Sequence, residues 1–214
     1  MKGRFITFEG PEGSGKSSHV SRVVARLKAQ GIDVVQTREP GGTPLGEAVR
    51  HLLQHDVSGD PPSPMAEALL FAASRAQLVA HVIRPALERG AWVVSDRFVD
   101  SSLAYQGAAR GFGIDTVWQI NAFAVDGVMP DLTLLMDIDV RTGFERLAGR
   151  YQGTGGGHDR IERETVDFHE AVRSGFLELA RRWPQRIKVI STVAEPDAVH
   201  AQVWQAVARL VGAA

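Results

Sequence analysis

The chain has 214 residues, which is enough for one domain with a substantial hydrophobic core. Its 24 basic and 25 acidic residues give a net charge of −1, so the composition does not favour a nucleic-acid partner. The chain has no cysteine, which excludes disulfides, thiol nucleophiles and cysteine-ligated zinc.

Short apolar runs alternate along the chain with longer segments of helical periodicity. This βαβ pattern predicts an α/β fold, in which a parallel sheet is covered by helices. Strands are predicted at residues 5–8, 33–37, 91–95, 132–137 and 187–191. Helices are predicted at residues 16–30, 45–54, 65–89, 116–125, 140–149, 161–182 and 197–211. Residues 57–64 and 151–158 are rich in glycine or proline and are predicted to be loops.

No domain linker or repeat interrupts the pattern, so we expect a single domain over residues 1–214. The N-terminus enters a strand-like run directly, without the apolar segment of a signal peptide. No apolar run is expected to span a membrane. These features predict a cytoplasmic protein with neither membrane nor nucleic-acid partners.

A glycine-rich segment lies between the first predicted strand and the first predicted helix. It matches the phosphate-binding pattern G-x-x-x-x-G-K-[ST] and reads Gly10-Pro11-Glu12-Gly13-Ser14-Gly15-Lys16-Ser17. Backbone N–H groups of such a loop surround phosphate oxygens, and the following helix N-terminus adds partial positive charge. Lys16 is predicted to reach the β- and γ-phosphates of ATP, and Ser17 to bind Mg²⁺. The alternative is a glycine-rich turn without a binding function, which would need neither the Lys16 nor the Ser17 side chain.

The remaining motifs narrow the class of P-loop protein. The chain has no N-K-x-D guanine motif, and Asp137 is followed by Ile138 rather than by the glutamate that many ATPases use to activate water. The third predicted strand ends instead in Asp96-Arg97. Because strand ends of a parallel sheet face the ligand crevice, Asp96 is predicted to hold magnesium and Arg97 an acceptor phosphate. A structural Asp–Arg pair is the alternative.

Further arginines and one aromatic side chain follow the same strand ends. Arg38 ends the second predicted strand, and Arg50 lies on the helix after it. Phe71 and Arg75 share one helical face at i, i+4, an arrangement able to stack on and hydrogen-bond to a nucleobase. Four arginines bracket the second glycine-rich loop and predict a lid at about residues 150–160 that closes over the transferring phosphoryl group: Arg146, Arg150, Arg160 and Arg163.

Together these stretches resemble the bacterial thymidylate kinases. The matching segments are residues 8–17, 37–43, 70–75, 96–107 and 158–162. The resemblance implies a P-loop three-layer fold with a five-stranded parallel sheet, a homodimer, and ATP with Mg²⁺ as phosphoryl donor. It also implies conversion of dTMP to dTDP for dTTP synthesis.

The resemblance assigns roles to individual positions. Phe71 is expected to stack on thymine and Arg75 to donate to its O4. Ser102 and Gln106 would make polar contacts around the base, and Tyr105 would crowd the 2′ position of the sugar. The resemblance further implies an acceptor-phosphate clamp of Arg38, Arg50 and Arg97, with Glu39 nearby and a cis bond between Glu39 and Pro40.

The lid arginine that stabilises the transition state is not assigned uniquely. Residues 151–157 are uncharged where relatives often carry basic residues, which leaves the catalytic choice open between Arg150 and Arg160. Two other functions also stay open. One is a P-loop kinase for another small acceptor, such as a deoxynucleoside or other nucleotide. The other is a nucleotide-binding regulatory module without turnover.

Overall fold

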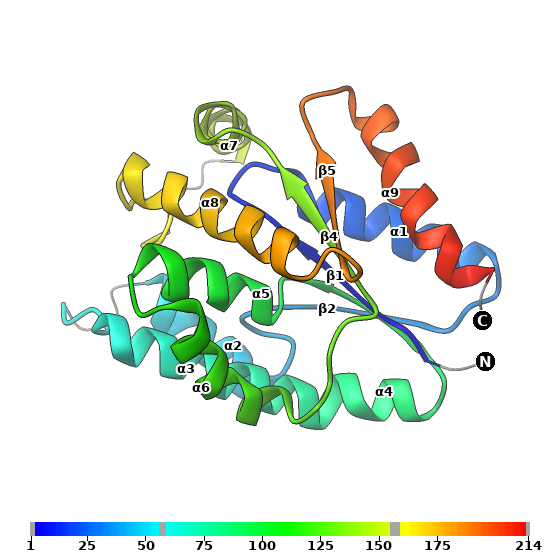
Figure 1. The fold of residues 1–214 in the computed structure, drawn as a ribbon, viewed down its shortest axis with the longest axis horizontal. Helices are drawn as coiled ribbons and strands as arrows, with labels where there is room; N and C mark the ends of the chain where they lie inside the picture. The colour runs from blue at the N-terminus through cyan, green and yellow to red at the C-terminus, as the bar shows by residue number, and fades with distance from the viewer. Residues whose placement is uncertain (1–2, 56–58, 155–158, 213–214) are drawn as a thin grey trace.

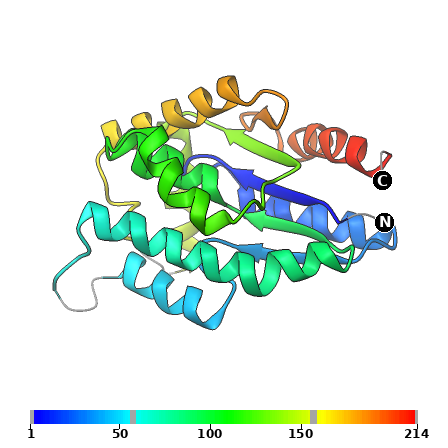
Figure 2. The same ribbon diagram turned by 60° about the horizontal axis from the view of Figure 1, so that its bottom comes forward.

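The computed structural model describes residues 3–55, 59–154 and 159–212. Figure 1 shows a central sheet with helices on both faces, and Figure 2 shows the same layers from a second direction. The strands are β1 (Phe5–Glu9), β2 (Val34–Arg38), β3 (Trp92–Asp96), β4 (Leu132–Asp137) and β5 (Ile187–Ser191). The α-helices are α1 (Lys16–Ala29), α2 (Pro44–Gln54), α3 (Pro64–Leu78), α4 (Arg84–Glu88), α5 (Val99–Ser102), α6 (Ile114–Val125), α7 (Val140–Thr154), α8 (Val166–Arg182) and α9 (Pro196–Val211).

All five strands are parallel, in the order β2-β3-β1-β4-β5. The predicted α/β fold with a five-stranded parallel sheet is confirmed, and each predicted strand lies within one residue of the observed one. From the central β1 the chain goes to the edge strand β2, returns to β3 beside β1, and then crosses to β4 and β5 on the other side. The crevice of a doubly wound sheet forms at such a point, outside the carboxyl ends of the strands.

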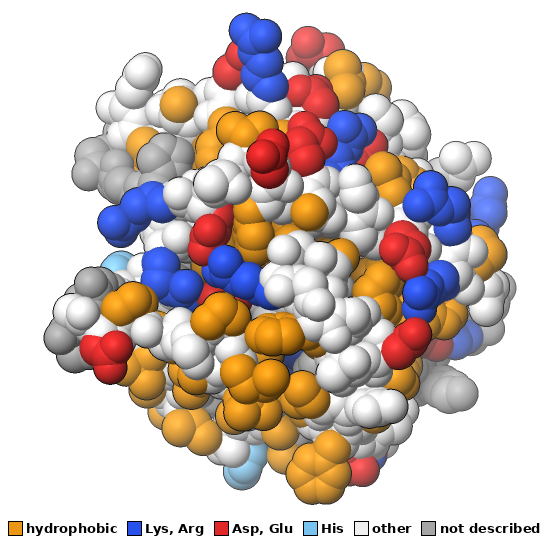
Figure 3. Space-filling model, turned by 60° about the vertical axis from the view of Figure 1, so that its left-hand side comes forward, with side chains coloured by type: hydrophobic (Ala, Val, Ile, Leu, Met, Phe, Trp, Pro, Cys, Tyr) orange, Lys and Arg blue, Asp and Glu red, His pale blue; other side chains and the backbone are white. Residues whose placement is uncertain are grey.

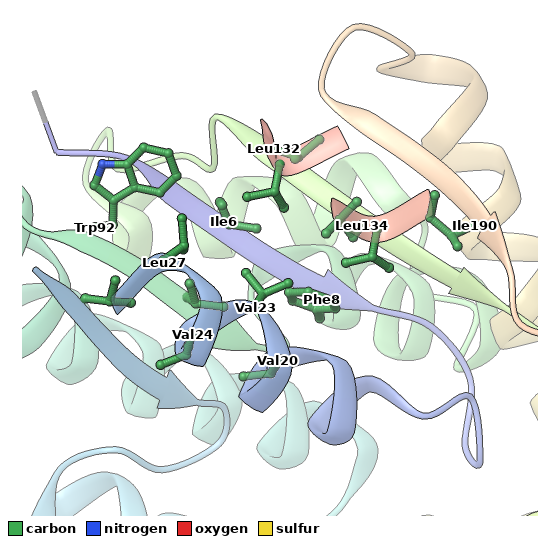
Figure 4. Close-up of a cluster of buried hydrophobic side chains, with 14 of the residues drawn as sticks. Ile6, Phe8, Val20, Val23, Val24, Leu27, Trp92, Leu132, Leu134 and Ile190 are labelled. Atoms are coloured by element: carbon green, nitrogen blue, oxygen red, sulfur yellow. The ribbon is translucent and has the colours of Figure 1, made fainter. Parts of the chain in front are cut away.

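Alternate residues of each strand supply cores on the two faces of the sheet. On one face, Ile6 and Phe8 of β1 pack with helices α1 and α9, through residues such as Val23 and Val203 (Figure 4). On the other face, Phe5 belongs to a second cluster with α3 and α4. A third cluster joins β4 and β5 to α8 on that face. Because strands buried on both faces carry near-continuous apolar runs, their positions could be predicted from the sequence.

The predicted helix at 65–89 forms as α3 and α4 joined by the π-helical segment η1 (Val79–Ile83). Pro85 near the start of α4 lacks the N–H that a regular α-helix requires there. The whole run Pro64–Glu88 is long and apolar enough, by length and composition, to pass as a membrane span, contrary to the sequence prediction. Its buried residues pack against the sheet, and 44% of its most apolar window is buried.

Two sequence predictions about helices are wrong. Residues 99–109 form α5 and the π-helical segment η2 (Leu103–Ala109), which were not predicted. This stretch is buried on nearly every side and so has no amphipathic period. Helix α8 begins at Val166 rather than at 161, because the Thr165 hydroxyl accepts a hydrogen bond from the Phe168 N–H and caps the helix.

The second predicted loop, residues 151–158, is also partly wrong. Residues 151–154 continue helix α7, and residues 155–158 lie outside the described part of the chain. After them, the Asp159 carboxylate accepts hydrogen bonds from the N–H groups of Ile161 and Glu162 and closes a turn. That turn occupies the place where helix 161–182 was predicted to begin.

Candidate active site

The phosphate-binding loop follows β1 at the carboxyl edge of the sheet and ends at α1. Gly13 has a φ of +69°, and a Cβ there would lie 2.0 Å from the Gly143 carbonyl oxygen, so only glycine fits. The Lys16 ammonium is folded against the loop and donates to the carbonyls of Gly10 and Pro11 at 3.0 and 2.8 Å. Burial lowers the pKa of Lys16 to about 8. The loop therefore presents a desolvated cation where donor phosphates are expected.

A pair of oxygens beside Lys16 fits the predicted magnesium site. The Ser17 hydroxyl lies 2.5 Å from the Asp96 carboxylate, and both line the cavity. One carboxylate oxygen of Glu39, also on the cavity wall, is buried and has no hydrogen-bond partner in the part of the chain that the structure describes. Among the described residues, no cluster of three or more His, Asp or Glu side chains exists. Mg²⁺ is usually held by one or two protein oxygens plus phosphates and waters, so this donor set suits it.

Arg97, Glu12 and Tyr105 form a network that spans the phosphate loop and the acceptor side. Arg97 adopts a φ of +71°, a rare conformation for a side-chain-bearing residue, and its side chain reaches Glu12 at 2.7 Å. The Tyr105 hydroxyl donates to the same Glu12 oxygen at 2.7 Å. Although burial raises it, the pKa of Glu12 falls to about 2 because of the Arg97 and Lys16 charges. Glu12 is therefore ionised, which the sequence motif alone did not reveal.

One cavity of about 660 Å³ brings most of the predicted site residues together. The phosphate loop from Glu12 to Ser17 lines one part of it. The predicted acceptor side is also present, through Arg38, Glu39, Arg50, Phe71, Asp96, Arg97, Ser102, Tyr105 and Gln106. The Glu39–Pro40 bond is cis, as the resemblance implied. Figure 3 shows Lys and Arg side chains interspersed with acidic ones on the face that is turned forward from the left of Figure 1.

Arg75 is not on the cavity wall. Its side chain is 1% exposed, and its Nε and Nη2 donate to Glu39. The other guanidinium hydrogens go to Ser102, Asn121 and the Phe98 carbonyl, so all five N–H donors are used. The expected direct contact of Arg75 with a base is therefore not met in this structure. Arg75 instead lies behind Ser102 and Glu39 and orients both.

The predicted lid arginines are divided between two locations. Arg146 and Arg150 line the cavity, and Arg146 donates to the Thr192 carbonyl at 2.9 Å. Arg160 is not among the lining residues, because it donates to the Leu53 carbonyl and forms a 2.6 Å ion pair with Glu67. In this structure Arg160 binds the C-terminal end of the predicted lid, which we call the lid base, to helices α2 and α3, while Arg150 lines the cavity.

Other features of the site could not be found from sequence. The end of the cavity beside the phosphate loop is lined by residues 192–196 together with His19, which the sequence analysis did not assign. Behind the phosphate loop, Glu9 is fully buried and accepts from the Phe98 N–H and the Ser101 hydroxyl. Burial, helped by nearby Asp100, raises the pKa of Glu9 to about 8. A strand-terminal glutamate gives no sequence signal of this kind.

Comparisons with known proteins agree with this geometry. A family model described as thymidylate kinase matches residues 8–203. The chain is 48% identical over 209 residues to a thymidylate kinase of Deinococcus radiodurans, covering 96% of this chain and 97% of the relative. It is 47% identical over 213 residues to one of Pelotomaculum thermopropionicum, covering 100% and 96% of the two chains. A crystal structure of thymidylate kinase from Ehrlichia chaffeensis superposes with a TM-score of 0.77 at 32% identity, covering 97% and 99%.

Proposed function

Since the chain belongs to the thymidylate kinase family, we propose that it transfers the γ-phosphoryl group of ATP to dTMP and releases dTDP and ADP. The observation that carries this proposal is the single cavity at the carboxyl edge of the sheet. It is lined by a complete phosphate-binding loop on one side and by Arg38, Arg50 and Arg97 on the other. A donor triphosphate and an acceptor phosphate can therefore meet between them. We place this activity in the cytoplasm, as a step of dTTP synthesis.

The proposed reaction is an in-line displacement. An oxygen of the dTMP phosphate attacks the γ-phosphorus, and the bond from that phosphorus to the β–γ bridging oxygen breaks, so that its electron pair leaves with ADP. The acceptor oxygen is already ionised near neutral pH, so the site needs no strong general base. Lys16 holds the donor phosphates. Arg97 holds the acceptor phosphate after its ion pair with Glu12 is replaced by an ion pair with that phosphate. Bound Mg²⁺, held by Ser17 and Asp96, would neutralise charge on the β- and γ-oxygens.

The acceptor nucleoside would lie against the aromatic wall of the cavity. Phe71 offers a ring for the base, and Ser102 and Gln106 offer polar atoms at its edge. The ring of Tyr105 is buried and held edge-on by Phe168 and Phe176, so it cannot move aside easily. A 2′-hydroxyl pressed against that ring would meet a steric barrier, which favours a deoxyribose.

The competing functions fit the cavity less well. A deoxynucleoside acceptor carries a neutral hydroxyl, which needs a general base and gives three acceptor-side arginines nothing to bind. A regulatory module would bind ATP without turning it over, and would not need an acceptor pocket.

A coupled ADP assay with a panel of nucleotides tests the proposed function. With ATP and Mg²⁺ we expect dTMP to be the best acceptor. We expect dUMP to be about 10–200-fold less efficient in kcat/KM, because it lacks only a methyl group. CMP should be rejected at Tyr105, and AMP and GMP should be close to background because a purine is larger than the pyrimidine that the pocket is proposed to hold. Better turnover of AMP or CMP than of dTMP would refute the dTMP assignment, while no turnover of any nucleotide would favour the regulatory module.

We also propose a homodimer, formed through the surface of helices α3 and α6. Met65 and Leu69 of α3 are about half exposed, and Phe123 of α6 is 91% exposed. Figure 3 shows hydrophobic side chains gathered in the lower part of one face. Large apolar groups exposed together mark an interaction surface.

Light scattering tests this dimer. We expect it to give twice the chain mass for the wild type and the single-chain mass for Phe123→Asp. A monomeric wild type would exclude this dimer.

A further inference from the structure

The carboxylate of Glu67 lies at a junction between the acceptor pocket and the lid. Glu67 belongs to the first turns of α3, and its side chain is 1% exposed. Its Oε1 accepts from the Gln106 amide at 2.9 Å and from Arg110 Nε at 3.3 Å. Its Oε2 accepts from Arg110 at 3.2 Å and from Arg160 at 2.6 Å. One buried group therefore holds a cavity-lining residue of η2 and a residue of the lid base.

The chemistry of this group determines how the Gln106 amide is turned. The hydrogen bonds from Arg110, Arg160 and Gln106 outweigh burial and hold the pKa of Glu67 below its usual value. An ionised carboxylate can only accept hydrogen bonds, so Gln106 must turn its NH₂ toward Glu67. Within the described residues, the carbonyl Oε1 of Gln106 accepts no hydrogen bond. Because Gln106 lines the cavity, that carbonyl is left for a donor on a bound ligand.

We propose that Glu67 is a positioning residue for base selection, which fixes the Gln106 amide with its carbonyl toward the acceptor base. This inference rests on the proposed function. Thymine and uracil carry an N–H at ring position 3, which a carbonyl can accept. Cytosine has a bare nitrogen lone pair at that position, which would face the Gln106 carbonyl without a hydrogen between them. The orientation imposed by Glu67 thus favours dTMP over dCMP.

The substitution Glu67→Gln is expected to reverse this orientation. Glu67 Oε2 accepts from two guanidinium NH₂ groups, at 3.2 and 2.6 Å, whereas the only arginine donor on Oε1 in the described part of the chain is Arg110 Nε at 3.3 Å. The carbonyl of the new amide should therefore stay at the Oε2 position. Its NH₂ would then replace Oε1 and face Gln106. Gln106 would turn its own carbonyl to that NH₂ and present a donor to the base. A donor suits cytosine and leaves the thymine N–H unpaired.

The measurement is the ratio of kcat/KM for dTMP to that for dCMP, with ATP and Mg²⁺, in full-length variants. In Glu67→Gln we expect this ratio to fall about 5–150-fold, the range for one unpaired buried polar group. Glu67→Asp keeps an acceptor-only carboxylate and should hold the ratio within a few-fold of wild type. Glu178→Gln is the matched control, since it removes an exposed Arg182 pair on α8 away from the cavity and should leave the ratio unchanged. General loss of stability would lower both kcat/KM values and leave their ratio as it was.

Each outcome has a separate meaning. A wild type that does not phosphorylate dTMP overturns the proposed function. A wild type that prefers dTMP, with an unchanged ratio in folded Glu67→Gln, overturns the role of Glu67 alone. If Glu67→Gln does not fold, Gln106→Met removes the amide while leaving the Glu67 ion pairs in place. An unchanged ratio in that variant also overturns the proposal.

Discussion

Replacing Lys16 with Met should abolish most turnover while leaving the fold intact. The ammonium, which donates to loop carbonyls in this structure, is proposed to serve as a point charge on the donor phosphates. Removal of one preorganised charge of this kind typically lowers kcat about 10²–10³-fold. Its burial already disfavours the charged form, as its lowered pKa of about 8 indicates. An apolar side chain of similar length should therefore not destabilise the free protein. We expect thermal melting at or above the wild-type temperature, with kcat in the coupled assay lowered by at least two orders of magnitude.

The matched control is Lys28→Met, which changes an exposed lysine on the same helix α1. It should keep wild-type kcat and KM. Near-normal dTMP turnover in a folded Lys16→Met protein would show that the phosphate loop does not use this lysine, and would contradict the donor assignment.

A segment of the fold could be predicted where its pattern of apolar and polar residues is typical of only one kind of secondary structure. The inner strands β1, β3 and β4 were placed within one residue because nearly all of their residues are buried on both faces of the sheet. The edge strands β2 and β5 are partly exposed and were found from their short runs of Val and Ile. Residues 99–109 were missed because the helix there is surrounded by protein. Gly175 of α8 comes so close that a Cβ would lie 2.7 Å from the Ala108 Cβ. Such a segment shows no period that a sequence can reveal.

In the site, too, features set by neighbouring residues could be predicted, whereas features set by residues far away in the sequence could not. The phosphate-binding pattern could be recognised completely from the sequence, because it consists of fixed residue types at fixed spacing. The structure places it between β1 and α1, as predicted. The sequence also indicated which arginines are candidates for the site, but it could not show which of their side chains line the cavity. Arg75 is held by Glu39, 36 positions away, and Arg160 by Glu67, 93 positions away. Both carboxylates are buried and strongly favour a cationic partner, so the tertiary fold decides where these arginines point.

The two lid arginines left open by the sequence should differ in their effect on catalysis. Arg150 lines the cavity near the end of α7, where its guanidinium lies 4.0 Å from Glu162 and over the Tyr151 ring. Its side chain is 60% exposed, so we expect it to reach a transferring phosphoryl group if the predicted lid closes. Arg160 is 19% exposed and would have to leave both Glu67 and the Leu53 carbonyl to do so. An arginine that stabilises only the transition state lowers kcat when removed and changes KM little.

We therefore expect Arg150→Ala to lower kcat about 10³-fold, the lower end of the range for arginines that stabilise phosphoryl transfer, with KM for dTMP within a few-fold of wild type. Arg160→Ala should act mainly through the lid base, with a smaller fall in kcat and a raised KM for dTMP. Arg141→Ala is the control, because it changes an 89% exposed arginine on the same helix as Arg150. Steady-state kinetics of the three variants and of the Arg150/Arg160 double variant make the comparison.

A larger loss of kcat in Arg160→Ala than in Arg150→Ala would assign the transition-state role to Arg160. It would also require that the ion pair between Arg160 and Glu67 breaks when the lid closes. Activity within a few-fold of wild type in the double variant would show that neither arginine serves the phosphoryl transfer.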